Sequence, residues 1–123
     1  MVRRGSDTLM FDCGEGTQQQ MMRSKSGFTL DAIFVTHWHA DHFLGIPGLI
    51  QTLSFMGREE PLTIYGPRGG HNFVDIVSDL AKNNLKFSLH SSELVPGSVI
   101  PFDGYHVQAF ATDHGIASLG YIL

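Results

Sequence analysis

The hydrophobic and polar positions along the chain change between strand-like and helix-like patterns. Short apolar or alternating runs predict strands at 8–12, 32–35, 62–65, 86–90, 99–102 and 106–111, and another begins at 121–123. Apolar residues at helical spacing predict helices at 44–56 and 73–80, and good helix formers follow Thr17 at 18–23. The run 32–35 has no polar side chain, which is typical of a strand covered on both faces. The pattern therefore predicts an α/β fold in which helices cover a sheet.

Glycine and proline mark the ends of several of these segments. Gly14-Glu15-Gly16 follows the first strand as a tight turn, and Gly57 is placed to end the first long helix. Pro47 is tolerable there because it falls in the first turn of that helix. Val95-Pro96-Gly97 predicts a turn between two strands. No linker or repeat divides the chain, so residues 1–123 are expected to form part of one domain.

The densest chemistry in the chain comes directly after the apolar run 32–35. The stretch THWHADH, residues 36–42, contains His37, His39, Asp41 and His42. Imidazole and carboxylate are ligands that zinc prefers, and a histidine pair followed by a carboxylate–histidine pair predicts two adjacent metal ions. The alternative is a set of structural histidines that happen to cluster. Four ligand-type residues at this spacing favour the metal site.

Several motifs resemble the ribonuclease Z family of the metallo-β-lactamase superfamily. The pattern HxHxDH at 37–42 is the hallmark of the superfamily, and alone it would indicate no more than that. The more specific segments are FDCGEGTQ at 11–18, THWHADHFLGIPGLIQTLSF at 36–55, LTIYGP at 62–67, TDHG at 112–115 and SLGY at 118–121. The resemblance therefore covers nearly the whole chain.

The resemblance implies a metal-ligand set of His37, His39, Asp41, His42 and His114. His37, His39 and His114 would hold one zinc ion, and Asp41 and His42 would contribute to a second. Asp41 would also be the catalytic proton acceptor. Asp12 would support the ligand loop from behind, as carboxylates near metal sites commonly fix the orientation of a ligand histidine. Spacing alone leaves His114 undecided between a ligand and a turn residue.

The implied fold is a four-layer αββα sandwich, of which 1–123 would be about half, truncated at both ends. The implied activity is removal of the 3′ trailer of precursor tRNA by metal-hydroxide attack on phosphorus, in a cytoplasmic homodimer. A bridging aspartate and a final histidine of the family would lie beyond Leu123, so we expect the isolated chain to be inactive. Two alternatives stay open: another hydrolase of the superfamily, acting on an ester, thioester or sulfate ester, or an inactive metal-binding fragment.

Composition adds few constraints. The formal net charge is −4 and no basic stripe is visible, which by itself argues weakly against a nucleic-acid partner. No apolar run approaches the ~20 residues that span a bilayer, and no signal peptide follows Arg3 and Arg4. The single cysteine, Cys13, excludes an intrachain disulfide and fits a reducing compartment.

The remaining candidate residues have ordinary interpretations. His71, His90 and His106 are expected to be structural or exposed, and Cys13 to be a buried thiol rather than a nucleophile. Ser118 is equally compatible with a substrate contact and with a turn. Pro67-Arg68-Gly69-Gly70 could cradle a phosphate ahead of a helix, but a plain strand-to-helix turn is favoured.

Overall fold

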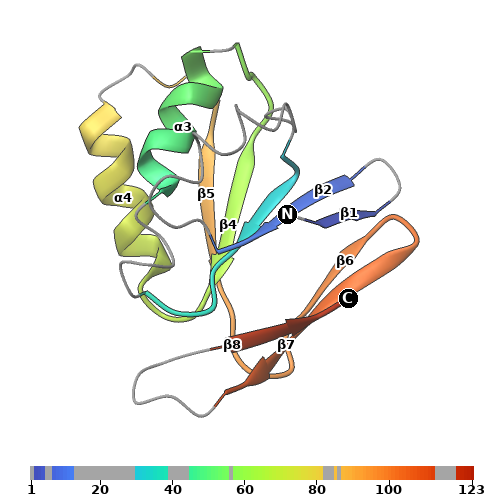
Figure 1. Cartoon of the computed structure of the whole chain (residues 1–123). Coiled ribbons are helices and arrows are strands. Elements are labelled where there is room, and N and C mark those ends of the chain that lie inside the picture. Colours follow the sequence, from blue (N-terminus) through green and yellow to red (C-terminus); the bar gives the residue numbers. More distant parts are fainter. Residues whose placement is uncertain are drawn as a thin grey trace.

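The computed structural model describes residues 2–4, 7–12, 30–38, 45–55, 57–81, 85, 87–112 and 119–123. Within this part of the chain, two sheets and two helices form three layers (Figure 1). No helix among the described residues is both long and apolar enough to cross a membrane.

The larger sheet has five strands in the order β1-β2-β3-β4-β5. These strands are β1 (Val2–Arg4), β2 (Asp7–Phe11), β3 (Ala32–Phe34), β4 (Leu62–Gly66) and β5 (Leu89–Glu93). β1 runs antiparallel to β2, whereas β2, β3, β4 and β5 are parallel to one another. Since parallel strands end at the same edge of a sheet, the segments that follow β2, β3 and β4 meet there.

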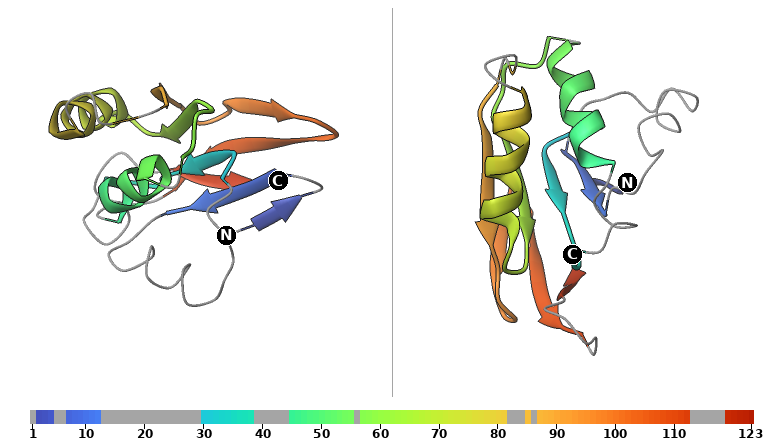
Figure 2. Two further views of the ribbon diagram at one scale, coloured as in Figure 1. Left: turned by 90° about the horizontal axis from the view of Figure 1, so that it is seen from above. Right: turned by 90° about the vertical axis from the view of Figure 1, so that its left-hand side faces the viewer.

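Two helices, α3 (Ile46–Phe55) and α4 (Gly70–Ala81), cover one face of this sheet (Figure 2). Ile33 and Val35 point to this side and join a core built with the inner faces of both helices. The helical contributions to that core are Ile46, Leu49, Ile50, Leu53, Val74 and Val77. The hydrophobic effect therefore holds both helices on this face of the sheet, with α4 lying against β5 and β4.

The opposite face of the sheet is covered by a second, antiparallel sheet of three strands (Figure 2). Its strands are β6 (Val99–Phe102), β7 (Tyr105–Ala111) and β8 (Leu119–Ile122). Leu9, Ala32 and Phe34 of the larger sheet pack against Ile100 and Val107 of the smaller one. β3 is thus buried on both faces, as its wholly apolar sequence predicts.

Most predicted elements are confirmed, with shifts at their ends. The helix predicted at 44–56 is α3, Pro47 lies in its first turn, and Gly57 follows it with φ of 94°. The strand predicted at 86–90 is wrong in position, because β5 begins only at Leu89 and continues to Glu93. β1 was not predicted. The helix expected at 18–23 lies outside the described residues.

Candidate metal centre

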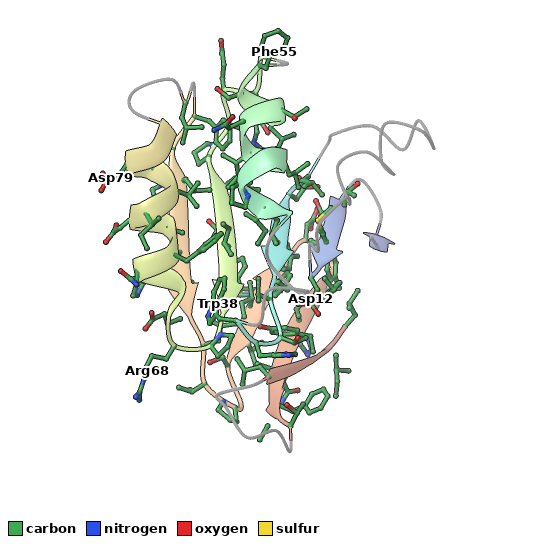
Figure 3. The ribbon with its side chains drawn as sticks, turned by 60° about the vertical axis from the view of Figure 1, so that its left-hand side comes forward. Asp12, Trp38, Phe55, Arg68 and Asp79 are labelled. Carbon is green, nitrogen blue, oxygen red and sulfur yellow. The ribbon has the colours of Figure 1, made fainter. Side chains whose placement is uncertain are left out.

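The ligand loop, residues 36–42, leaves the sheet where β3 ends, and its described part is 36–38. Asp12 follows β2 at the same edge, because Phe11 of β2 pairs in register with Phe34 of β3. Figure 3 shows Asp12 and Trp38 toward this end of the sheet, while Phe55 lies at the other end. The parallel pairing of β2 and β3 therefore brings Asp12 and the start of the ligand loop together.

Asp12 is hydrogen-bonded both to the end of β3 and to the first residue of the ligand loop. Its own backbone N–H donates to the carbonyl oxygen of Phe34 at 2.7 Å. Its carboxylate accepts from the backbone N–H of Thr36 at 2.9 Å and from the Thr36 hydroxyl at 3.1 Å and 3.3 Å. Asp12 has φ of 60°, a left-handed conformation that aspartate tolerates better than most residues. The backbone of Asp12 is therefore in a conformation that goes with a carboxylate directed at Thr36.

The Thr36 hydroxyl connects Asp12 to His37. Its Oγ1 lies 3.0 Å from Nδ1 of His37, whose side chain is only 6% exposed. A hydroxyl has one hydrogen to donate, and an ionised carboxylate can only accept. When Thr36 donates to Asp12, its oxygen accepts from Nδ1–H of His37. The neutral imidazole then carries its lone pair on Nε2, which is the form that can bind a metal ion.

Strand β8 of the smaller sheet holds the same loop from another side. The backbone N–H of Leu119 donates to the carbonyl oxygen of Thr36 at 2.7 Å, and the Tyr121 hydroxyl donates to that of Val35 at 2.6 Å. Burial, and then the nearby charge of Asp12, raises the pKa of Tyr121 above its usual value. The phenol therefore stays protonated and keeps donating across the neutral pH range. Two segments far apart in sequence, Asp12 and β8, hold the loop in place.

The four other predicted metal ligands, His39, Asp41, His42 and His114, lie outside the described residues. Within the part of the chain that the structure describes, no three His, Cys, Asp or Glu side chains gather as a metal site would require. The ligand set thus remains a prediction, for which His37 and its hydrogen bonds provide a described anchor.

The sequence profile of the Metallo-beta-lactamase superfamily matches residues 1–115. The chain belongs to the metallo-β-lactamase superfamily. The structure agrees with this, since the described residues form one helical layer and both sheets of the fold. No second helical layer is found among the described residues.

Relatives within the superfamily are similar to this chain along its whole length. It is 56% identical to the ribonuclease Z of Methanosarcina acetivorans over 124 aligned positions, which cover 100% of this chain and 41% of that protein. It is 47% identical to the ribonuclease Z of Myxococcus xanthus, covering 99% of this chain and 40% of that protein. The chain therefore spans about two fifths of the length of these curated relatives.

Solved structures of the superfamily show the same arrangement. The short form of human tRNase Z matches with a TM-score of 0.85 and 33% identity, covering 98% of this chain and 55% of that one. A diphosphatase of the PhnP family matches with a TM-score of 0.71 and 21% identity, covering 98% of this chain and 46% of that one. The second likeness is evidence of the metallo-β-lactamase fold alone.

Sequence analysis missed two residues of this superfamily site. Thr36 stands in the THWHADH motif, yet no role was assigned to its hydroxyl. The signal that was available is a hydroxyl residue directly before the first histidine. Tyr121 was noted only as part of SLGY, and no sequence pattern shows that its hydroxyl reaches the carbonyl oxygen of Val35.

In the turn between β4 and α4, two backbone amides that could bind an anion already donate to a side chain of the protein. The Glu93 carboxylate accepts from the N–H of Gly69 at 3.0 Å and from that of His71 at 3.2 Å. Since helix N-termini attract negative charge, this side chain fills the position that a phosphate would take. These bonds favour the interpretation as a plain strand-to-helix turn. His71, His90 and His106 are exposed, as expected.

Replacing Glu93 with glutamine is expected to lower the melting temperature at pH 7 and to have a smaller effect at pH 3. The N–H groups of Gly69 and then His71 lower the pKa of Glu93 below its usual 4.5. Such a carboxylate stabilises the fold above pH 4.5, and the contribution disappears as pH falls through the lowered folded value. Thermal melts of wild type and Glu93→Gln across pH 3–7 measure the difference. Glu59→Gln, at an exposed position after α3, is the control, and a gap that stays constant with pH would contradict the prediction.

Proposed function

We propose that the protein is a metal-dependent endoribonuclease that removes the 3′ trailer of precursor tRNA. The observation that carries the proposal is the 56% identity to a ribonuclease Z along the whole of this chain. Because that alignment covers 41% of the relative, the activity, substrate and partners of a complete enzyme are all part of the proposal. Residues 1–123 would contribute the part of one domain that contains the ligand loop.

The described residues fit a metal ion. The bonds from Asp12 to Thr36 and from Thr36 to His37 leave Nε2 of His37 as an acceptor, which is what a zinc ligand must be. We include His39, Asp41, His42 and His114 as the further ligands, and zinc, as two ions, as the metal. When bound, such a pair supplies Lewis acidity and lowers the pKa of water toward ~7.

The chain's own residues would then have separate tasks in phosphodiester hydrolysis. Asp41 would accept the proton of the attacking water. Asp12 and Thr36 would keep Nδ1 of His37 protonated, and Tyr121 would hold the loop backbone through the carbonyl oxygen of Val35. None of the last three needs to touch RNA. We further propose a homodimer that acts on precursor tRNA in the cytoplasm.

Cleavage of a precursor tRNA with a labelled 5′ end and a 3′ trailer tests the function. The 123-residue chain and the longest polypeptide that its gene encodes are assayed side by side. We expect the longer polypeptide to release a tRNA with a 3′ hydroxyl and a trailer with a 5′ phosphate. A chelator should abolish cleavage and added zinc should restore it.

Two variants distinguish this reaction from contaminating nucleases. His37→Ala should reduce cleavage by more than the ~10- to 100-fold that loss of an outer partner typically costs. His106→Ala changes the same residue type at an exposed site on β7 and should leave the rate unchanged. Cleavage that survives both chelation and His37→Ala would exclude the proposed function.

A further inference from the structure

Trp38 lies between the first two histidines of the ligand loop in sequence, yet its indole packs on another part of the fold. The ring rests on three glycines at the end of β4 and the start of α4, which we call the glycine cradle: Gly66, Gly69 and Gly70. A Cβ atom at these positions would lie 3.2, 3.0 and 3.3 Å from atoms of the indole, in that order. Side chains at any of the three would therefore crowd the ring.

Two further contacts fix the orientation of the indole. Its Nε1–H donates to the carbonyl oxygen of Pro67 at 3.1 Å, and its ring is tilted against that of Phe73 with centroids 5.1 Å apart. A partly buried tryptophan such as Trp38 combines apolar contacts with a polar partner for its N–H. The ring is thus held by the floor of the cradle, by one hydrogen bond and by the first turns of α4.

The cradle itself is fastened to β5. Glu93 accepts from the N–H of Gly69, and the N–H of Leu94 donates to the carbonyl oxygen of Gly66 at 2.7 Å. Gly69 has φ of 116°, a conformation open to glycine and strained for other residues. The surface that receives Trp38 is therefore set by strand pairing and by a helix cap, independently of the ligand loop.

Holding Trp38 restricts its two neighbours. Consecutive Cα atoms are ~3.8 Å apart, so anchoring the side chain at position 38 limits where the Cα atoms of His37 and His39 can lie. A functional site works only when its groups are held to within about 0.5 Å. Asp12 and β8 hold the loop through Thr36 and Val35, and the cradle holds it from the α4 side.

We propose that Trp38 is a positioning residue for the metal site, received by a glycine cradle that α4 and β4 provide for it. The proposal rests on the proposed function, since that function makes the ligand loop a metal-binding loop. Trp38 is not assigned a contact with substrate. Its role is to set the spacing of the two histidines that flank it. The indole leaves no room for a side chain at Gly66, Gly69 or Gly70.

The first test measures metal affinity in Trp38→Phe, Gly70→Ala and the double variant, each in the longest polypeptide the gene encodes. Phenylalanine keeps a ring but loses the N–H and the benzo atoms, so zinc affinity should fall about 10-fold, with kcat recovering at saturating zinc and KM unchanged. Gly70→Ala should also weaken zinc binding, because its methyl group meets Cζ2 of Trp38. In the double variant that atom is gone, and Gly70→Ala should have no further effect.

A second test records tryptophan emission from the 123-residue chain, in which Trp38 is the only tryptophan. Gly69→Ala and Gly97→Ala place alanine at similar positive φ values, 116° and 93°, but only the first methyl group would meet the indole. We expect Gly69→Ala to shift the tryptophan emission and weaken zinc binding, and Gly97→Ala to do neither. This pair decides the matter even where Trp38→Phe yields no folded protein.

The outcomes separate the two proposals. Folded Trp38→Phe that binds zinc as tightly as wild type overturns the positioning role, while tRNA cleavage by wild type leaves the function intact. Suppose that wild type binds zinc, that the variants bind it more weakly, and that wild type never cleaves precursor tRNA. That result supports the positioning role and overturns the proposed function. Additive losses in the double variant, or equal effects of Gly69→Ala and Gly97→Ala, count against the cradle.

Discussion

Replacing Phe34 with alanine is expected to destabilise the fold by about 3–5 kcal/mol, the usual cost of removing a buried phenylalanine side chain. Phe34 is 0% exposed and lies at the centre of an aromatic row across three neighbouring strands. Its ring stacks between Phe11 of β2, at 5.1 Å, and Tyr65 of β4, at 4.8 Å. Tyr121 of the smaller sheet meets it edge-on at 5.1 Å. The alanine variant would open a cavity between the two sheets.

Such a loss is large compared with the ~5–15 kcal/mol that separates folded from unfolded states of ordinary domains. Urea unfolding followed by circular dichroism measures the shift in midpoint. Phe55→Ala is the matched control, since Phe55 is 89% exposed and its removal should change stability by less than about 0.5 kcal/mol. Similar midpoints for the two variants would show that the aromatic row does not hold the sheets together.

The central position of Phe34 was predictable from sequence in outline. An apolar run without polar interruption can only be stable where both faces are covered, so the strand at 32–35 and its buried place followed directly. The side-chain period of a strand then divides it: Ile33 faces the helices and Phe34 faces the second sheet. Which aromatic rings would meet Phe34 depends on strand order and register, which no local pattern contains.

The misplaced β5 shows where local patterns mislead. Residues 86–90 alternate, but Phe87 is buried in the helix-side core before the strand begins. The strand itself contains Ser91, Ser92 and Glu93, whose polar side chains argue against a strand by composition. Pairing with β4, from Leu62 with Leu89 to Gly66 with Glu93, decides its position. The polar residues have a use there, because Glu93 caps α4.

The candidate site also has a part that sequence predicts and a part that only the fold shows. Candidate metal ligands can be predicted from residue type and spacing, and Asp12 can be predicted from the glycine turn that follows it. The contacts of Thr36, Trp38 and Tyr121 cannot be predicted in this way, because they arise from the approach of β2, α4 and β8. Sequence therefore predicts candidate ligands, and the fold adds the hydrogen bonds that hold the described start of the ligand loop.

Asp12→Asn is expected to lower metal affinity by about 10- to 100-fold while changing stability much less. Asparagine is nearly the same size and also tolerates the φ of 60° found at this position. Its amide oxygen can still accept from the backbone N–H of Thr36. Its amide nitrogen, however, would face the Thr36 hydroxyl in place of a carboxylate oxygen.

That exchange reverses the direction of the hydrogen bonds that lead to His37. The amide N–H₂ donates to the Thr36 hydroxyl, which then donates its own hydrogen to Nδ1 of His37. The neutral imidazole must carry its proton on Nε2, where a metal ion can no longer bind. Thr36→Val, which removes the hydroxyl, should weaken metal binding for the related reason that Nδ1–H loses its acceptor, and Thr36→Ser should retain most of the affinity.

Asp7→Asn provides the matched control for the charge change. Asp7 is the first residue of β2, the strand that Asp12 follows, and its carboxylate accepts from the Tyr105 hydroxyl at 2.8 Å, away from the ligand loop. Zinc titrations of the three proteins should then show wild type and Asp7→Asn binding alike and Asp12→Asn binding weakly, with similar melting temperatures in the absence of metal. NMR of the imidazole nitrogens in the metal-free proteins should assign the proton to Nδ1 of His37 in wild type and to Nε2 in Asp12→Asn. If Nδ1 carries the proton in both proteins, any loss of affinity in Asp12→Asn comes from the lost charge alone. The Thr36 hydroxyl would then have no part in selecting the form of His37 that binds metal.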